Sequence, residues 1–278
     1  MKKSILFIFT ACFLFTTSCS DFLDEEHKTK YSSEYVFGTP EGLKLAVNAL
    51  YALQRYYAND TENATIFALE RGTDLAVTNG GTGNFYGIYD PNYLKPSASQ
   101  VGFMWRTMYQ IIGKANEIIA AAEDLEDTPS LRATVSEAKC FRAQSYFLLY
   151  RTFDRIWLNI QPTTAENVND PRDFHAASEK EVFDLIYEDL EYAITNLDWV
   201  SDEAGRFTQA AARHMKAKAA LWLKDWDTTL EQVEEIEKSG HFDLIALNEV
   251  FNAGDLNHKE ALMVQQWSKN PGGNLSNA

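Results

Sequence analysis

The sequence predicts an all-α protein of antiparallel helix pairs with long loops and minimal sheet. Apolar residues recur at three- and four-residue steps in several segments, and helix-capping residues precede most of these segments. Only one short stretch, Leu262–Trp267, has the pattern of a strand. At 278 residues, 45% of them hydrophobic, the chain is long enough to bury a substantial core.

The first packed helix is predicted to begin at Pro40, because Thr39 is a good N-cap and a proline fits the first helical position. Its apolar stripe consists of Leu43, Ala46, Val47 and Leu50, with Tyr51 at the edge. A second helical period follows, formed by Val101, Met104, Trp105, Met108, Ile112, Ala115, Ile119 and Ala122. Trp105 is therefore expected to be a core residue.

The central element is a long helix that opens at Thr128-Pro129 and continues without Gly or Pro to about Asp154. Its second half is apolar almost all round, which is typical of a helix buried on several sides. Cys140 lies on this helix and is expected to be a small core residue rather than a nucleophile, because a reactive thiol needs exposure and positive surroundings.

Three further helices are predicted in the second half of the chain. A capping box at Ser178-Glu181 opens the first, whose apolar face is Val182, Ile186, Leu190, Ala193 and Leu197. Thr208 opens the next, and a turn at Lys224-Asp225 leads to the last, which carries Leu230 and Val233 and ends at Ser239-Gly240. Ala217, Trp226 and Thr229 resemble a tetratricopeptide hairpin. The helix pairs lack the strict period of about 34 residues, so the expected fold is tetratricopeptide-like.

The N-terminus has the features of an export signal over residues 1–18. Lys2 and Lys3 precede an apolar run, Ile5–Phe15, that is too short to span a bilayer. The small residues before Cys19 resemble a bacterial lipobox, in which Cys19 is acylated, for example with palmitate, and becomes the first mature residue. An ordinary signal peptide cut nearby is the alternative. Residues 19–36 are polar and acidic and are predicted to be the acylated cysteine and its tether.

Charge and motifs exclude several functions. The formal charge of −15 repels phosphate backbones, so nucleic acid is not expected as a partner. The chain has no H-E-x-x-H or G-x-S-x-G motif and no Cys/His cluster at metal-ligand spacing, so neither an enzyme, a cofactor nor a metal site is predicted. The glycine-rich stretch Gly81–Gly87 is not a phosphate loop, because Asp90-Pro91 blocks the helix that such a loop requires.

A long loop over residues 71–96 is the predicted ligand-binding site. Long loops inside compact proteins are commonly functional, and this one combines aromatic rings with carboxylate and amide groups. Rings stack on the apolar faces of a sugar while polar groups bond its hydroxyl rim. The candidate ligand-binding residues are Asp74, Asn79, Asn84, Phe85, Tyr86, Tyr89, Asn92 and Tyr93. The alternative is that these aromatics only pin the loop to the helices. A second long connection is expected over residues 153–177.

The central helix also carries a family resemblance. Glu137-Ala-Lys139, Phe141-Arg-Ala143, Tyr146-Phe147 and Leu149 resemble the corresponding helix of the SusD/RagB family of outer-membrane nutrient-binding lipoproteins. Further matching pieces occur in order, namely Cys19–Asp24, Gly72–Asp74, Trp105–Asn116, Pro171-Arg172 and Glu260–Gln265. The resemblance thus extends from Cys19 to about residue 266.

This resemblance implies a cell-surface glycan-binding lipoprotein of the outer membrane, which passes oligosaccharides to a SusC-like TonB-dependent transporter. It implies that residues 37–268 are the N-terminal part of the helical domain, that residues 269–278 are a disordered end, and that the C-terminal half of a typical member is absent. Members usually have Gly and Pro after the central helix, where this chain has Phe153–Leu158. The alternative function is a tetratricopeptide-like adaptor lipoprotein that binds a protein and no sugar.

Overall fold

The computed structural model describes residues 31–58, 95, 99–164, 166–171, 174–250 and 257–265. Its helices are α2 (Ser33–Gly38), α3 (Pro40–Ala58), α5 (Ser99–Ala122), α6 (Pro129–Thr152), α7 (Glu179–Asn196), α8 (Gln209–Leu223), α9 (Trp226–Lys238) and α10 (Leu247–Val250). The described residues contain no strand, so the all-α prediction is confirmed. The strand predicted at Leu262–Trp267 is not formed in its described part, which ends at residue 265.

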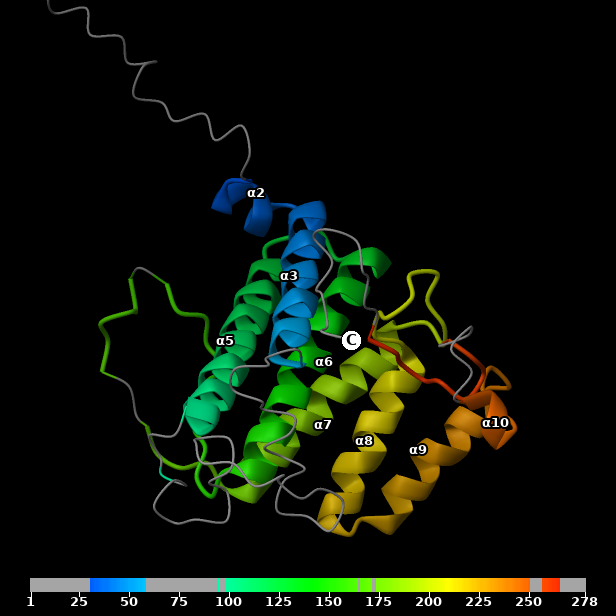
Figure 1. The fold of residues 1–278 in the computed structure, drawn as a ribbon. Coiled ribbons are helices and arrows are strands. Elements are labelled where there is room, and N and C mark those ends of the chain that lie inside the picture. The colour runs from blue at the N-terminus through cyan, green and yellow to red at the C-terminus, as the bar shows by residue number, and fades with distance from the viewer. Residues whose placement is uncertain are drawn as a thin grey trace, which may run out of the picture.

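The long helices pack side by side in nearly their chain order, with α6 at the centre (Figure 1). α6 contacts α3, α5, α7 and α8, and α8 in turn packs against α9. The connections from α5 to α6 and from α8 to α9 are short, which makes each of these pairs antiparallel neighbours, as in tetratricopeptide-like helix pairs. None of the helices described here is long and apolar enough to cross a membrane.

The helix boundaries follow the predicted capping residues. The Thr128 hydroxyl accepts a hydrogen bond from the Leu131 amide at 3.2 Å, and Pro129 follows it at the start of α6. Ser178 forms a complete capping box with Glu181 at the start of α7. Lys224 ends α8 in the left-handed conformation, with φ 62°, and the next residue caps α9. Local side-chain chemistry therefore sets where these helices begin and end.

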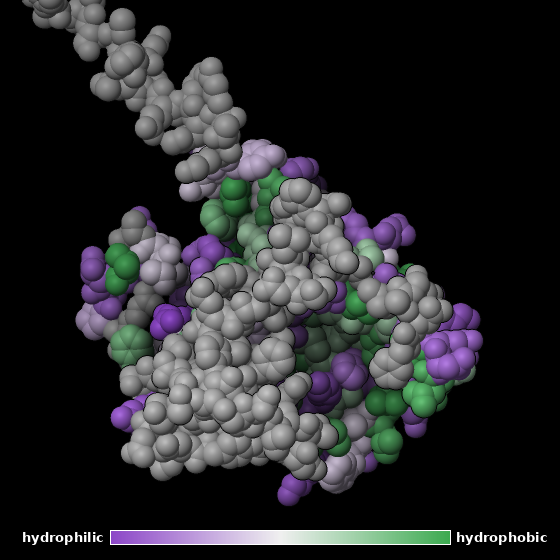
Figure 2. Space-filling view, in the orientation of Figure 1, coloured by the Kyte–Doolittle hydropathy of each residue, from purple (hydrophilic) through white to green (hydrophobic). Residues whose placement is uncertain are grey.

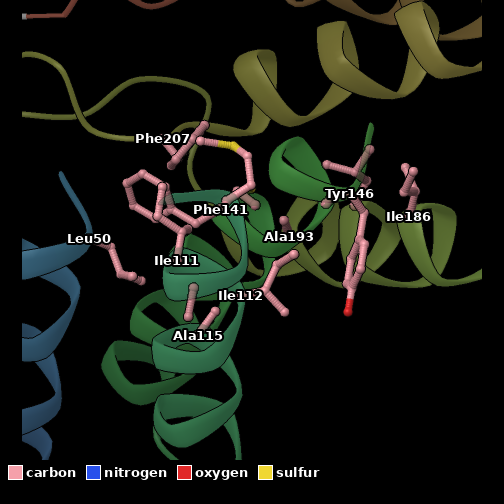
Figure 3. Packing of buried hydrophobic residues seen from close by; sticks show 14 of the residues in the cluster. Leu50, Ile111, Ile112, Ala115, Phe141, Tyr146, Ile186, Ala193 and Phe207 are labelled. Atoms are coloured by element: carbon pink, nitrogen blue, oxygen red, sulfur yellow. The ribbon is translucent and has the colours of Figure 1, made fainter. Parts of the chain in front are cut away.

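The core forms where α3, α5, α6 and α7 meet (Figure 3). Phe141 lies at its middle and makes edge-to-face contacts with Tyr51, at 4.7 Å between ring centroids, and with Phe207, at 4.9 Å. Cys140 is fully buried, and burial raises the pKa of its thiol, so it is the inert core residue that was predicted.

The first helix begins earlier in the chain than predicted. α2 begins at Ser33, inside the range 19–36 expected to be a tether, and the Ser32 hydroxyl caps it. α2 then packs closely on the start of α3, where Gly42 lies against the backbone of Tyr35 and Val36. A side chain at position 42 would clash with that backbone, so the tight α2–α3 corner requires glycine.

The last long helix presents its apolar stripe to solvent. Trp226, Leu230 and Val233 of α9 are 57%, 59% and 42% exposed, whereas the buried residues of α9 are Gln232 and Ile236. Figure 2 shows apolar atoms at the lower right of the molecule, over this helix. The described part of the chain therefore leaves an uncovered apolar surface on α9.

Candidate functional site

The predicted ligand-binding loop lies outside the residues that the structure describes. This applies to Asp74, Asn79, Asn84, Phe85, Tyr86, Tyr89, Asn92 and Tyr93. It also applies to the predicted lipidation residue Cys19. Within the described residues, the candidate site is instead on the second long connection, which follows α6.

Two tyrosines bond the backbone of the first part of this connection. The Tyr109 hydroxyl donates to the Trp157 carbonyl oxygen and accepts from the Trp157 amide, both at 2.8 Å. The Tyr146 hydroxyl does the same for Asn159, at 2.9 and 2.7 Å. Both backbone groups of these two residues are thereby satisfied without a partner strand. Tyrosine side chains from α5 and α6 thus hold the backbone of the connection that follows the central helix.

A buried polar cluster, formed by Asn116, Lys139, Arg142 and Asp189, supports this part of the loop. The Asn116 side chain on α5 donates to the Asn159 carbonyl oxygen at 2.7 Å and accepts from Arg142 Nη1 at 2.8 Å. Arg142 also donates to both carboxylate oxygens of Asp189, each at 2.7 Å, and Lys139 Nζ donates to the same carboxylate at 2.8 Å. The cluster joins α5, α6 and α7 and fixes the loop relative to the helices.

The pKa shifts of Arg142 and Tyr146 are consistent with the hydrogen bonds that these side chains make. Burial alone would lower the pKa of Arg142, but the hydrogen bonds and negative charge of Asp189 outweigh it and raise that pKa. Burial also raises the pKa of the Tyr146 hydroxyl, which therefore stays protonated as a donor to Asn159. Both groups keep the charge state that their hydrogen bonds require, so their role is to position the loop rather than to react.

Four aromatic side chains line an open pocket beside this loop. Trp105 and Tyr109 come from α5, and their ring centroids are 4.8 Å apart. Trp157 lies 6.3 Å from Tyr109 in a stacked arrangement, and 4.8 Å from Phe174. The pocket has a volume of about 630 Å³, and its remaining lining residues are Arg155, Ile156, Asn159, His175 and Ala176. A row of rings with polar groups at its edge can bind a ligand that has apolar faces and a hydroxyl rim.

The pocket corrects the prediction for Trp105 and adds residues that the sequence alone did not indicate. Trp105 is only partly buried, because it packs against the core while also lining the pocket. Trp157 and Phe174 were not predicted as site residues, since nothing in an irregular segment shows which rings will meet. Asp189 was also missed, although its position within the apolar stripe of α7, between Ile186 and Ala193, was a detectable signal.

Metal ligands do not gather in the described regions, where no group of three His, Cys, Asp or Glu side chains could hold an ion. The polar side chains that line the aromatic pocket are one guanidinium, one amide and one imidazole, from Arg155, Asn159 and His175.

Comparison with known families identifies the fold. The sequence model of a family described as SusD-like, "Starch-binding associating with outer membrane", matches residues 21–221. The chain belongs to this SusD-like family. The matched residues include all of α6, and the structure shows that Arg142 of this helix belongs to the buried ion cluster.

SusD-like relatives match over most of this chain. A SusD-like protein of Bacteroides ovatus is 25% identical, and the match covers 96% of this chain and 50% of that protein. SusD-like protein P38 of Formosa agariphila is 27% identical over 88% of this chain and 48% of its own length. The chain thus spans about half the length of the curated relatives it matches.

Solved SusD-like structures share the fold. A SusD-like protein of Bacteroides fragilis superposes with a TM-score of 0.67 at 20% identity, over 86% of this chain and 47% of that one. A protein described as a laminarin-binding SusD-like protein gives a TM-score of 0.64 at 23% identity, over 74% and 46% of the two chains. A structure determined with a xylogluco-oligosaccharide gives 0.67 at 22% identity, over 81% and 46%. These similarities establish the tetratricopeptide-like helical fold.

Proposed function

We propose that this SusD-like chain is a cell-surface glycan-binding lipoprotein that captures oligosaccharides for import through a partner TonB-dependent transporter of the outer membrane. The observation that carries the proposal is the row of rings in the pocket beside α6, in a chain whose family is described as starch-binding and associated with the outer membrane. The laminarin-binding protein and the protein solved with a xylogluco-oligosaccharide support the choice of ligand class.

The pocket has the chemistry that a sugar requires. Phe174 is 68% exposed and meets Trp157 at 57° between ring planes, so the two rings offer neighbouring apolar faces. Arg155, Asn159 and His175 lie at the same pocket and can bond hydroxyl groups. Each aromatic contact contributes about 0.5–1.5 kcal/mol beyond its burial, so this pocket alone gives weak binding. We propose that the loop residues from Asp74 to Tyr93 supply the remaining contacts.

Calorimetric titration with laminarin- and xyloglucan-derived oligosaccharides tests the site. Trp157→Ala and Phe174→Ala should each weaken binding by about 2- to 13-fold, the equivalent of one aromatic contact. Trp226→Ala, which removes an exposed ring on α9 that does not line the pocket, should leave the affinity unchanged. If Tyr86→Ala or Tyr89→Ala abolishes binding while both pocket variants bind normally, the sugar binds on the loop alone. If no variant and no wild-type sample binds any glycan, the proposed function is wrong.

The proposed membrane anchor depends on Cys19. Each methylene of an acyl chain buried in lipid contributes about 0.8 kcal/mol, and two or more chains anchor a protein stably. Cys19→Ser should therefore release the protein from outer-membrane fractions and abolish incorporation of labelled palmitate. Membrane retention of the serine variant without acyl label would contradict lipidation at this residue.

We propose binding without catalysis. Prolonged incubation of the protein with a bound oligosaccharide should leave the chain length of the sugar unchanged by mass spectrometry. The appearance of shortened sugars with pure protein would overturn this part of the proposal.

A second candidate function is supported by α9. Its exposed stripe of Trp226, Leu230 and Val233 is bordered by acidic residues, which suits an amphipathic partner helix with basic flanks. In this alternative the chain is a helical adaptor lipoprotein and binds no sugar. The glycan titration above separates the two candidates, because only the first predicts sugar binding.

A further inference from the structure

A second pocket lies among α3, α5, α6, α7 and α8 and shares no residue with the aromatic pocket. Its volume is about 160 Å³. Most of its lining is apolar, with Met108, Ile111, Leu148, Ile186, Leu190 and Met215 among the residues that form it. The lining also contains two aromatic and two positively charged side chains, namely Tyr57, Phe147, Arg151 and Lys218.

Two cations at this pocket have no acidic partner among the residues that the structure describes. Arg151 comes from the last turn of α6 and Lys218 from α8, and neither forms an ion pair or donates a hydrogen bond within the described ranges. By contrast, other cations on the same two helices are each paired with a carboxylate, namely Lys139 and Arg142 on α6 and Lys216 on α8. Free positive charge at a pocket is notable in a chain with a formal charge of −15.

An aromatic ring holds Arg151 at the pocket without neutralising its charge. The Arg151 guanidinium carbon lies 4.5 Å from the centroid of the Phe147 ring, a cation–π arrangement that fixes the side chain at the pocket. α8 carries four basic or imidazole side chains and no Asp or Glu. An anion that approaches Lys218 along α8 therefore meets no negative charge from that helix.

The Tyr57 side chain, which also lines this pocket, carries a buried hydroxyl group with no hydrogen-bond partner among the described residues. Tyr57 on α3 is 9% exposed, and its hydroxyl has no hydrogen-bond partner in the described part of the chain. Burial raises the pKa of Tyr57 to about 12, although the positive charge of Arg151 acts in the opposite direction. The phenol therefore stays protonated and is available as a donor. Buried hydroxyl groups are nearly always paired, so an unpaired one that lines a pocket points to a ligand atom.

We infer that this pocket is a subsite for the anionic group of an acidic sugar, either the carboxylate of a uronic acid or a sulfate ester. Arg151 and Lys218 bind the charge, Tyr57 donates a hydrogen bond to one oxygen, and Phe147 offers a ring. Trp222, which is 48% exposed and makes an edge-to-face contact with Phe147, extends this aromatic surface outward.

The volume defines how much of the ligand enters. Sites that enclose a whole drug-sized molecule have volumes of about 300–1,000 Å³. At about 160 Å³ this pocket holds the charged end of one sugar unit, and the rest of the oligosaccharide stays outside. The inference rests on the proposed function, because it assumes that the ligand is an oligosaccharide, and it narrows that ligand to an acidic one.

Calorimetric titration of the full mature chain tests the subsite with four probes: a galacturonate trisaccharide, a sulfated oligosaccharide, a neutral glucan oligosaccharide and inorganic sulfate. Arg151→Gln and Lys218→Gln should each weaken binding of an acidic sugar by about tenfold or more, as expected for loss of a charged hydrogen bond. Binding of the neutral sugar should not change. Lys218→Arg should preserve affinity, and Tyr57→Phe should weaken it by a few-fold.

The matched control is Lys180→Gln, which removes a cation from an exposed pair on α7 and does not line the pocket. It should bind acidic sugars like the wild type. Thermal melts of all variants establish that each is folded. The two acidic probes distinguish a uronate from a sulfate ester as the preferred group.

Each outcome decides one of the two proposals. Loss of acidic-sugar binding in Arg151→Gln and Lys218→Gln, with neutral binding intact, supports the subsite. Equal acidic-sugar binding in both variants and the wild type overturns it. Binding of neutral sugars but of neither acidic probe overturns the subsite and leaves the proposed function standing, whereas absence of all sugar binding overturns the proposed function. Binding of inorganic sulfate without any acidic sugar also overturns the subsite.

Discussion

The guanidinium of Arg142 on α6 holds both carboxylate oxygens of Asp189 on α7 at 2.7 Å, and the Asp189 side chain is fully buried. Lys139 shares the same carboxylate, and Asn116 connects the guanidinium to the loop that carries Trp157. One buried ion cluster therefore links the packing of the central helices to the geometry of the candidate site.

Asp189→Asn should destabilise the protein strongly. The substitution leaves Arg142 and Lys139 buried without their counter-charge, and removal of one partner of a buried pair costs about 3–5 kcal/mol. The free energy of unfolding, measured by urea titration, should fall by that amount. Asp184→Asn breaks an exposed pair on the same helix and should cost less than about 1 kcal/mol. Similar losses for the two variants would show that the cluster does not stabilise the helix packing.

Tyr109→Phe should loosen the loop without unfolding the core. The substitution keeps the ring but removes the hydroxyl that satisfies both backbone groups of Trp157. Hydrogen exchange at the Trp157 amide should become faster, while exchange in α6 and α7 stays unchanged. Tyr150→Phe is the control, because its hydroxyl bonds only the exposed Glu179 side chain. Unchanged exchange at Trp157 in Tyr109→Phe would mean that other contacts hold this segment.

His214 should make the protein less stable in acid. The His214 side chain is exposed but partly desolvated by its neighbours; this desolvation lowers its pKa, and the positive charge of Lys218 lowers it further, so the effect on stability should be small. The unfolded chain therefore binds a proton more readily than the folded one, so stability falls as pH drops below the ordinary histidine value of 6.5 and continues to fall until the lowered folded pKa is passed. His214→Gln should show a smaller drop in unfolding midpoint between about pH 8 and pH 5.

A control separates this histidine from other acid-sensitive groups. Lys218→Gln should raise the pKa of His214 measured by NMR, because it removes the neighbouring positive charge. An identical pH dependence of stability in His214→Gln and the wild type would contradict the prediction.

We expect the exposed apolar stripe of α9 to promote self-association, which Leu230→Lys should reduce while leaving stability nearly unchanged. Leu230 is 59% exposed within the apolar stripe of α9, so a charge there interrupts the stripe without entering the core. Sedimentation at increasing concentration should show fewer oligomers, and the free energy of unfolding should change by less than about 0.5 kcal/mol. Ile236→Ala, on the buried side of α9, should instead cost about 2 kcal/mol or more. Equal oligomer content in Leu230→Lys and the wild type would show that the stripe does not drive association.

Local patterns predicted the helices well because capping and periodicity act over a few residues. Thr128, Ser178 and Thr208 cap the helices that the sequence predicted from them. The start of the fold was harder to predict, because α2 is short and is held by its close packing on Gly42 rather than by an apolar stripe. The proposed roles of Cys19 and of the loop from Asp74 to Tyr93 remain predictions.

The sequence by itself determined the all-α class, the capped helix boundaries, the buried central helix and the resemblance to its family, since each depends on neighbours along the chain or on a contiguous motif. Only the tertiary structure decided which polar groups meet across helices. Asp189 is 47 residues from Arg142, and Tyr57 is 94 residues from Arg151. A pattern within one helix shows which residues share a face, but the partner of that face depends on how all the helices pack together.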